Sequence, residues 1–457
     1  MLGFTYCRVL ASAALVAFSI AASSSDISLA RSPAPIAPSK DSFYAVPENI
    51  ESFAPGAIIN HRQPPSPIAA FGISQVNLQS SHQLLYRTTD NHGNATATVV
   101  TVLVPHHADM SKVLSYQVAE DAASPDCAPS YAFQFKSATG PFVGTIVTQM
   151  ELLLIEAALE QGWVVITPDF LGPKASYLAN KLAGHATLDG IRAAFQSSSF
   201  TGIDQDPTVA MWGYSGGSVA TNWAAELQPT YAPELRIVGA AVGGTVPKVS
   251  SVVKTINKGP FAGFIPAGVM GLISQYPDLR EIIEKHLKPE YSAKFHSVLS
   301  QCLAADAIKF AFDDIHSMFD VPNLILTDET ATRILNENDL GLNTPQIPFF
   351  WYKSTNDEIS PIDDTDELVD SYCERGVSIE YVRDLLSEHS SSAATGAPKA
   401  LSWLKDRLNG KEISSGCTKK TKASSLLDPA TLRIVPKAIV DGLLDLLAHK
   451  PVGPLFG

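Results

Sequence analysis

The residues best suited to chemistry form the pattern G-x-S-x-G over positions 213–217, with Ser215 at its centre. An apolar run over 209–212 precedes the pattern, and an amphipathic segment that ends near Leu227 follows it. A strand, a tight turn and a helix in this order are typical of a nucleophile elbow, whose strained serine backbone requires small flanking residues. Lys-Ser or Lys-Thr does not follow the last glycine, which argues against a phosphate-binding loop. We predict a nucleophilic Ser215; the alternative is a structural turn without chemistry.

A serine hydroxyl needs a neighbouring base, which in turn needs a carboxylate to orient it. In sheets of the kind expected here, the acid and then the histidine follow the serine along the chain. His389 follows a predicted strand over 377–382, lies in a polar loop of small residues and precedes a predicted helix over 399–408. We predict that it is the base; the alternative is an ordinary surface histidine. The other histidines after the serine are His286, His296 and His316 in helical segments, and His449 near the C-terminus.

The orienting acid should follow the strand before the histidine. The apolar run 349–352 turns abruptly into an acidic segment, in which Asp357 is the best-placed carboxylate. Its nearby competitors are Glu358, Asp363 and Asp364. The alternative is that all four belong to a solvated acidic loop.

Stabilisation of an oxyanion requires donors aimed at the developing charge. The backbone N–H of Gly216, the residue after the serine, is one such donor. The second should come from the loop over 116–122, which lacks the HGGG motif. It could be a backbone N–H or the side chain of Asp121, if an apolar site keeps that carboxyl protonated. The alternative role for Asp121 is a carboxylate that caps the loop.

Strands and helices alternate through the first half of the chain. Two runs separated by a turn predict a hairpin, and later helices lead directly into short apolar strands. This order predicts an α/β fold with a largely parallel sheet and helices on both faces. The predicted strands are 82–88, 96–104, 112–118, 163–166, 209–212 and 237–242, and the predicted helices are 145–162, 187–196 and the segment from the elbow to about 227.

The alternation stops over 249–343, where the sequence predicts helices at 278–286 and 295–312 and no strand. A strand follows at 348–352. A helical block between two strands predicts a cap over the carboxyl edge of the sheet. Its most apolar part, 261–273, could be a buried cap helix, a lining for long acyl chains, or both.

The first 30 residues have the features of a secretory signal: one cation at Arg8, an apolar run over 9–22 and small residues over 28–30 for cleavage. The alternative is an apolar N-terminal helix of the fold. No other apolar run reaches the ~18–20 residues that span a bilayer. We therefore expect an exported protein without a stable membrane anchor.

Export affects the interpretation of the cysteines. After Cys7 is removed with the signal, four remain, an even number that favours two disulfides among three possible pairings. Their spacing fits no compact zinc pattern, so we predict no metal site. Asn94-Ala95-Thr96 is a glycosylation sequon in a polar turn, either used or left bare. The four cysteines are Cys127, Cys302, Cys373 and Cys417.

Composition limits the partners. The 457 residues are 45% hydrophobic, which fits a globular protein large enough for one core with an insertion. The net charge of -13 argues against nucleic acid or an anionic membrane surface as a partner. We expect an acidic monomer that needs no cofactor.

Short stretches across nearly the whole chain after the leader resemble the fungal secretory lipase family. They occur in order and include the serine motif and the segments around the candidate acid, base and oxyanion residues. They are 116–118, Glu120-Asp121, 126–131, 188–193, 213–217, 231–235, 259–264, 357–359 and Glu388-His389.

The resemblance implies an α/β-hydrolase fold with a helical cap and a triad of Ser215, Asp357 and His389. It also implies that the side chain of Asp121 and the N–H of Gly216 form the oxyanion hole. The chain departs from the family in a loop rich in Ser and Ala over 390–394 and in a short C-terminus beyond Phe456. Both departures border the pocket expected for the substrate.

The resemblance further implies disulfides between Cys127 and Cys302 and between Cys373 and Cys417. It implies a C-terminal flap over the active site. The expected organisation is a signal peptide and leader over 1–30, the hydrolase core over 31–248 and 344–416, the cap over 249–343 and the flap over 417–457.

These features predict a secreted serine carboxylic-ester hydrolase, foremost a triacylglycerol lipase that meets its ester substrate at a lipid–water interface. One alternative is a narrower esterase that deacetylates a secondary metabolite of the trichothecene type. A more distant alternative is a hydrolase fold without catalysis that serves binding.

Overall fold

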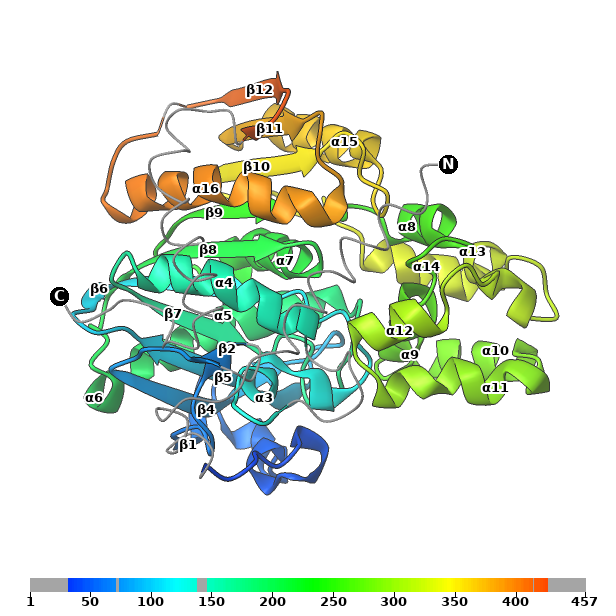
Figure 1. The fold of residues 1–457 in the computed structure, drawn as a ribbon, viewed down its shortest axis with the longest axis horizontal. Coiled ribbons are helices and arrows are strands. Elements are labelled where there is room, and N and C mark those ends of the chain that lie inside the picture. Colours follow the sequence, from blue (N-terminus) through cyan, green and yellow to red (C-terminus); the bar gives the residue numbers. More distant parts are fainter. Residues whose placement is uncertain (1–31, 71–73, 138–145, 414, 426–457) are drawn as a thin grey trace, which may run out of the picture.

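The computed structural model describes residues 32–70, 74–137, 146–413 and 415–425. In this part of the chain, ten strands form one sheet in the order β1-β4-β5-β7-β6-β8-β9-β10-β11-β12 (Figure 1). The seven strands from β7 to β12 in this order are parallel, and the other three continue the sheet in antiparallel pairs. The strands are β1 Ile58–Arg62, β4 Ser80–Thr89, β5 Ala95–Val104, β6 Asp109–Gln117, β7 Trp163–Pro168, β8 Thr208–Tyr214, β9 Ile237–Gly243, β10 Phe349–Ser354, β11 Ile379–Asp384 and β12 Cys417–Lys422, with β2 Ala69–Ala70 and β3 Ser74–Gln75 in a separate pair.

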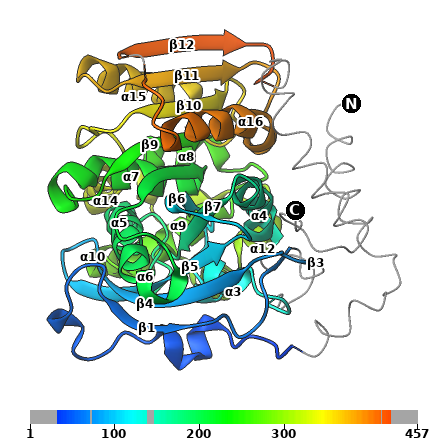
Figure 2. The ribbon, with the colours of Figure 1, turned by 90° about the vertical axis from the view of Figure 1, so that its left-hand side faces the viewer.

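Helices cover both faces of the sheet, which explains why its central strands are apolar throughout rather than alternating (Figures 1 and 2). The helices α5, α7 and α15 pack on one face, and α4 and α16 pack on the other. The predicted hairpin, parallel sheet and covering helices are therefore confirmed, and the fold is that of an α/β-hydrolase. The covering helices are α4 Ile146–Leu159, α5 Asn180–Gln196, α7 Gly216–Tyr231, α15 Ile362–Glu374 and α16 His389–Leu408.

Shorter elements complete the described core. They are the helices α3 Pro129–Ala132 and α6 Ser198–Thr201 and the 3₁₀ turns η1 Pro38–Lys40, η2 Ser42–Tyr44, η3 Ile50–Ser52 and η4 Pro125–Cys127.

The register of the parallel strands brings the candidate catalytic segments to one edge of the sheet. Tyr214, the last residue of β8, lies opposite Gly243 of β9. Ser354, the last residue of β10, lies opposite Asp384, the last of β11. Because the carboxyl ends of parallel strands share an edge, the turns that follow β8, β10 and β11 meet there.

The segment between β9 and β10 is a helical block, as predicted, and it lies beyond this same edge, on the right of Figure 1. Its helices share a hydrophobic cluster of their own, centred on buried side chains such as Ile265, Phe295 and Ile334. Its elements are α8 Val249–Ile256, α9 Phe264–Ile273, α10 Pro277–His286, α11 Pro289–His296, η5 Ser297–Ser300, α12 Leu303–Lys309, η6 Ile315–Met318, α13 Leu324–Thr327 and α14 Glu329–Glu337.

One helix prediction within this block is wrong. The segment 295–312 is not a single helix, because α11 ends at His296 and α12 begins only at Leu303. Between them, Cys302 has an extended backbone, with φ -105° and ψ 168°, and forms a disulfide with Cys127. The 3₁₀ turn η5 and the extended residue Cys302 thus interrupt a helical pattern that is continuous in the sequence.

Two disulfides lie within the described residues, and they join the pairs that the resemblance implies. Cys127–Cys302 connects the loop region after β6 to the helical block, and Cys373–Cys417 connects α15 to β12. The first six residues of the predicted flap, 417–422, form β12 at the edge of the sheet, paired with β11. The predicted signal sequence and residues 426–457 of the predicted flap lie outside the described residues.

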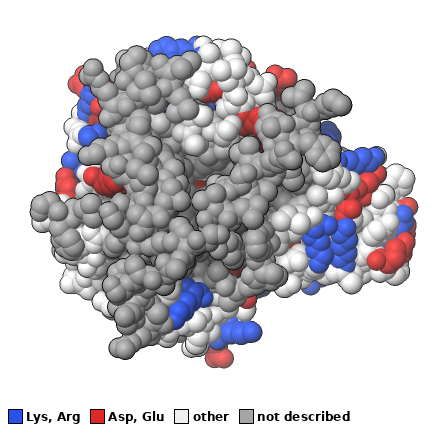
Figure 3. Space-filling model, in the orientation of Figure 1, with Lys and Arg blue, Asp and Glu red and all other residues white. Residues whose placement is uncertain are grey.

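The described surface carries both charges. Figure 3 shows Lys and Arg side chains interspersed with Asp and Glu over the helical block on the right of the molecule. None of the helices in the described ranges is long and apolar enough to cross a bilayer. The described residues also contain no group of three or more His, Cys, Asp or Glu side chains suited to hold a metal ion.

Candidate active site

Ser215 occupies a strained turn between β8 and α7, with φ 50° and ψ -124°. Its flanking glycines are required because the turn is tightly packed. A Cβ atom on Gly213 would lie 2.3 Å from the carbonyl oxygen of Gly217. A Cβ atom on Gly217 would lie 2.0 Å from the carbonyl oxygen of Gln117 on β6. The pattern over 213–217 therefore forms a sharp elbow that presents the serine at the edge of the sheet.

The structure brings the three predicted residues together. The Nε2 atom of His389 lies 2.8 Å from Ser215 Oγ, and its Nδ1 atom lies 2.8 Å from Asp357 Oδ2. An ionised carboxylate only accepts hydrogen bonds, so Nδ1–H donates to Asp357 and leaves Nε2 to accept from the serine hydroxyl. His389 and Asp357 are both buried, so little water competes for these bonds.

The carboxylate of Asp357 is held from both sides. Its Oδ1 atom accepts the backbone N–H groups of Ile359 and Ser360 at 3.0 and 2.8 Å. Its Oδ2 atom also lies 3.0 Å from Nζ of Lys353. Burial alone would raise the pKa of Asp357, but the charges of His389 and Lys353 and these hydrogen bonds lower it well below its usual range. The side chain thus remains a carboxylate that can orient the imidazole.

The predicted surroundings of His389 need correction. His389 is not in a loop before a helix at 399; it is the first residue of α16. A capping box causes the early start, because the side chain of Glu388 accepts the N–H of Ser391 and Ser391 Oγ accepts the N–H of Glu388. The backbone N–H of His389 donates to Glu358 Oε2 at 2.8 Å. The helix start therefore fixes where the imidazole lies.

The competing acids have other partners. Glu358 binds the backbone of His389, as described above, and Asp364 lies 3.3 Å from Lys248. Asp363 is in the first turn of α15.

Two of the rival histidines form ion-pair contacts within the helical block, His286 with Asp320 and His296 with Glu284. His316 also lies in that block, and His449 is outside the described residues.

Asp121 lies directly beside Gly216. A Cβ atom at position 216 would be 1.9 Å from Asp121 Oδ1, so only glycine allows this approach. Asp121 is buried, and among the described residues its Oδ1 atom has no hydrogen-bond partner. Burial raises the pKa of Asp121 to about 7, although the charge of His389 opposes the rise. Below about pH 7, the site therefore holds mainly a protonated carboxyl next to the serine.

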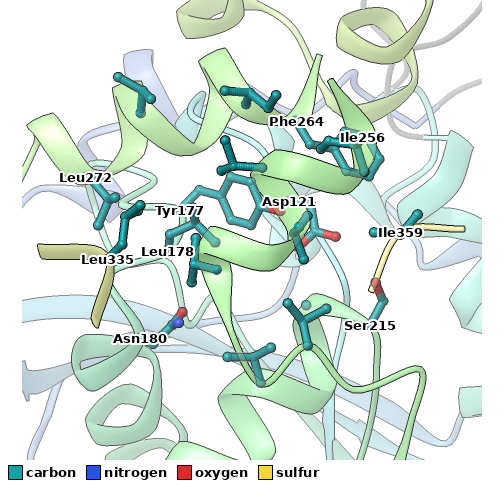
Figure 4. Close-up of a pocket in the computed structure, with 18 of the residues that line it drawn as sticks. Asp121, Tyr177, Leu178, Asn180, Ser215, Ile256, Phe264, Leu272, Leu335 and Ile359 are labelled. Carbon is teal, nitrogen blue, oxygen red and sulfur yellow. The ribbon is translucent and has the colours of Figure 1, made fainter. Parts of the chain in front are cut away.

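A pocket opens from Ser215 into the space between the core and the helical block. Most of its walls are aliphatic or aromatic, and few polar residues contribute. Figure 4 shows Ser215 and Asp121 toward one end of the pocket and Leu272, Leu335 and Asn180 toward the other. The apolar walls include Leu178, Val219, Val246, Val249, Val252, Val253, Ile256, Phe264, Ile265, Val269, Leu272, Ile325, Leu335 and Ile359.

Helix α9 is both a packing element and a pocket wall. Phe264, Ile265, Val269 and Leu272 contribute to the pocket, while Ile273 packs into the cluster of the helical block. The segment 261–273 therefore contains a buried helix that also lines the pocket, and its contact with long acyl chains stays a prediction.

Two charged contributors were missed by the sequence reasoning. Lys353 follows four large apolar residues at the end of β10, and a lysine that continues a buried strand is a signal in itself. Glu358 was considered only as a rival to Asp357. The spacing Asp-Glu after a strand does not reveal that the second carboxylate turns toward the helix that carries His389.

Comparisons with known proteins identify the family of this chain. The sequence model of the family described as secretory lipase matches residues 134–416. Lipase A of Arthroderma benhamiae is 50% identical over 423 residues, which cover 92% of this chain and 90% of the relative. The chain belongs to the secretory lipase family. Lipase 1 of Candida albicans is 36% identical and covers 91% of this chain and 90% of its own length.

The family assignment extends to solved structures. Candida antarctica lipase A superposes with a TM-score of 0.79 at 30% sequence identity, covering 93% of this chain and all of that one. The esterase LipA from Xanthomonas oryzae has a TM-score of 0.59 at 17% identity and shares the fold alone. This member of the family therefore has the fold that the sequence predicted.

The predicted glycosylation sequon lies on the surface of the protein. Asn94 is exposed in the turn between β4 and β5. Its side-chain Nδ2 donates to Asp90 Oδ2 at 3.0 Å, and its backbone N–H donates to Asp90 Oδ1 at 2.8 Å. Attachment of a glycan at Asn94 stays a prediction.

Proposed function

We propose that this chain is a secreted serine carboxylic-ester hydrolase, foremost a triacylglycerol lipase, that forms an acyl-enzyme on Ser215. The observation that carries the proposal is the pair of 2.8 Å contacts that link Ser215 through His389 to Asp357 at the mouth of an apolar pocket. Membership of a family described as secretory lipase supports both the reaction class and export.

The reaction follows from the orientation of these groups. His389 Nε2 takes the hydroxyl proton of Ser215 while Oγ attacks the ester carbonyl. The N–H of Gly216 and the protonated carboxyl of Asp121 donate to the oxyanion that forms. His389 then gives its proton to the departing alkoxide, and an acyl-enzyme remains. Water, activated by the same histidine, releases the carboxylic acid and restores Ser215.

The pocket supports a substrate with an apolar acyl chain. A long chain gains free energy by leaving water for the aliphatic walls, at roughly 0.8 kcal/mol per buried CH₂ group. Relatives that are named lipases match over nine-tenths of this chain. In this proposal, residues 249–343 form a cap that selects the acyl group.

The test combines one variant with two substrates. Ser215→Ala should lower kcat by roughly 10⁴ or more and abolish labelling by a fluorophosphonate, because no other group replaces the nucleophile. An unchanged melting temperature would show that the variant is folded. Hydrolysis at near wild-type rates by the folded variant would contradict the serine mechanism.

The second part of the test addresses the substrate. Turnover of an emulsified long-chain triglyceride is compared with turnover of a soluble acetyl ester, at equal concentrations of active sites. We expect the triglyceride to be hydrolysed efficiently. A strong preference for the acetyl ester would replace the lipase proposal with the narrower esterase. Failure of the wild-type protein to react with the fluorophosphonate would instead favour a binding protein without catalysis.

A further inference from the structure

Lys353 places a cation in the interior, directly behind the candidate triad. It lies near the end of β10, four residues before Asp357, and its side chain is 1% exposed. Its Nζ atom lies 3.0 Å from Asp357 Oδ2 and donates to the carbonyl oxygen of Thr245 at 2.8 Å. Burying an ammonium group is costly unless it is paired, and an apolar side chain would continue the strand more cheaply. The contact with Asp357 therefore offsets part of the cost of burying the ammonium group.

Lys353 and His389 share one acceptor atom. Asp357 Oδ2 lies 3.0 Å from Lys353 Nζ and 2.8 Å from His389 Nδ1. The ammonium and the imidazole are thus within about 6 Å of each other, a distance at which charges in a protein interior interact strongly. A proton added to His389 would create a second positive charge beside the first.

We propose that Lys353 is a positioning residue that balances the charge of the triad: its ammonium holds the carboxylate of Asp357 in place and repels a second positive charge on the neighbouring imidazole. This inference rests on the proposed serine mechanism. It concerns the pH range in which that mechanism works, and no step of the reaction passes through Lys353.

The other charged groups near His389 carry negative charge, and the remaining titratable groups are neutral. None of them repels a positive charge on the imidazole. The carboxylate of Glu358 accepts the backbone N–H of His389, and Asp121 faces it from the loop after β6. Tyr214 donates its hydroxyl to the carbonyl oxygen of His389. Asp364 faces Lys353 and is also paired with Lys248.

Lys353 therefore supplies the positive charge that offsets these carboxylates. Among the described residues, it is the one Lys or Arg that forms an ion pair with Asp357. Burial lowers the pKa of Lys353, while the charge of Asp357 and their hydrogen bond oppose that change. The ammonium form and the carboxylate form thus support each other.

The test is the pH profile of kcat/KM for a soluble butyrate ester. Lys353→Gln keeps a hydrogen-bond donor but removes the charge, and Lys353→Met removes both. We expect the acid limb of the profile to move to higher pH by about one unit or more in each variant, because one unit corresponds to a modest Coulomb interaction at this distance. Lys353→Arg keeps the charge, and its acid limb should remain near that of the wild type.

A matched control removes the same charge elsewhere. Lys411→Gln lowers the net charge equally, but the Lys411 side chain is 67% exposed and pairs with Asp406 at the surface, beyond the end of α16 that is far from His389. Its acid limb should not move, since water and salt screen exposed charges.

The outcomes separate this inference from the proposed function. If Lys353→Gln is folded and its acid limb coincides with that of the wild type, the charge does not act on His389 and the inference is wrong, whatever the change in kcat. A limb that moves as far in Lys353→Arg as in Lys353→Gln would also overturn it. Near wild-type activity of Ser215→Ala would instead refute the serine mechanism itself.

Discussion

Asp121 can stabilise an oxyanion only while its carboxyl group carries a proton. Burial raises the pKa of this group to about 7, with the charge of His389 opposing the rise. Below that pH the neutral carboxyl donates a hydrogen bond. Above it the carboxylate has no proton to donate and repels the negative charge that develops on the substrate. We therefore predict that activity has an alkaline limb caused by Asp121.

The size of the effect follows from the ionisation. One pH unit above its pKa, about nine-tenths of a carboxyl group is ionised, so kcat/KM should fall about tenfold for each further unit. The fall levels off when the whole contribution of this donor is lost. Removal of one oxyanion donor costs roughly 10²–10³ in kcat, or about 2.7–4 kcal/mol.

Two variants at this position test the reasoning. Asp121→Asn offers an amide N–H that does not titrate, so its alkaline limb should disappear while substantial activity remains. Asp121→Ala removes the donor and should be roughly 10²–10³ slower in the neutral range. Initial rates on a soluble ester, corrected for active sites with a phosphonate titrant, provide kcat/KM across the pH range.

The result that would refute the reasoning is specific. A wild-type profile that stays flat well above neutral pH would show that the ionisation of Asp121 does not limit the reaction. The same alkaline limb in folded Asp121→Asn would show that another group titrates there. Either result would leave the N–H of Gly216 as the donor that the geometry supports.

Two further predictions concern the helical block. The double variant Cys127→Ala, Cys302→Ala should be less stable by about 2–5 kcal/mol, because the lost bond closes a long loop, and its melting temperature should fall in a thermal scan; an unchanged melting temperature would contradict a stabilising role. Leu272→Trp should fill the end of the pocket away from Ser215 and lower kcat/KM for long-chain esters by tenfold or more, with short-chain esters little affected (Figure 4). Equal losses for all chain lengths would show that acyl chains do not reach Leu272.

The sequence alone was sufficient for the order of the elements and for the core of the site. Apolar runs that alternate with amphipathic segments specify a parallel sheet, because the period of hydrophobicity is set by local backbone geometry. The elbow at Ser215 could be predicted for the same reason, since a strained local turn requires its glycines. Asp357 and His389 could be selected because each follows a strand that ends at the same edge.

Tertiary structure decided the features that depend on contacts between distant segments. The segment 295–312 has a continuous helical pattern, but the folded chain interrupts it before Cys302, which is cross-linked to Cys127. The position of His389 at the start of α16 depends on Glu358, which approaches from the turn after β10 and accepts the backbone N–H of His389. The helical period of a sequence cannot reveal that Cys302 pairs with Cys127 or that His389 pairs with Glu358.

The protonation states of the site residues were the feature that the sequence predicted least. Whether Asp121 holds a proton depends on its burial beside Gly216, and whether Lys353 is charged depends on its contact with Asp357. A pKa is set by desolvation and by charges brought close in space, and neither can be read from the order of residues. The sequence by itself thus determined which groups could do the chemistry, and the tertiary structure decided which of them meet and in which protonation state.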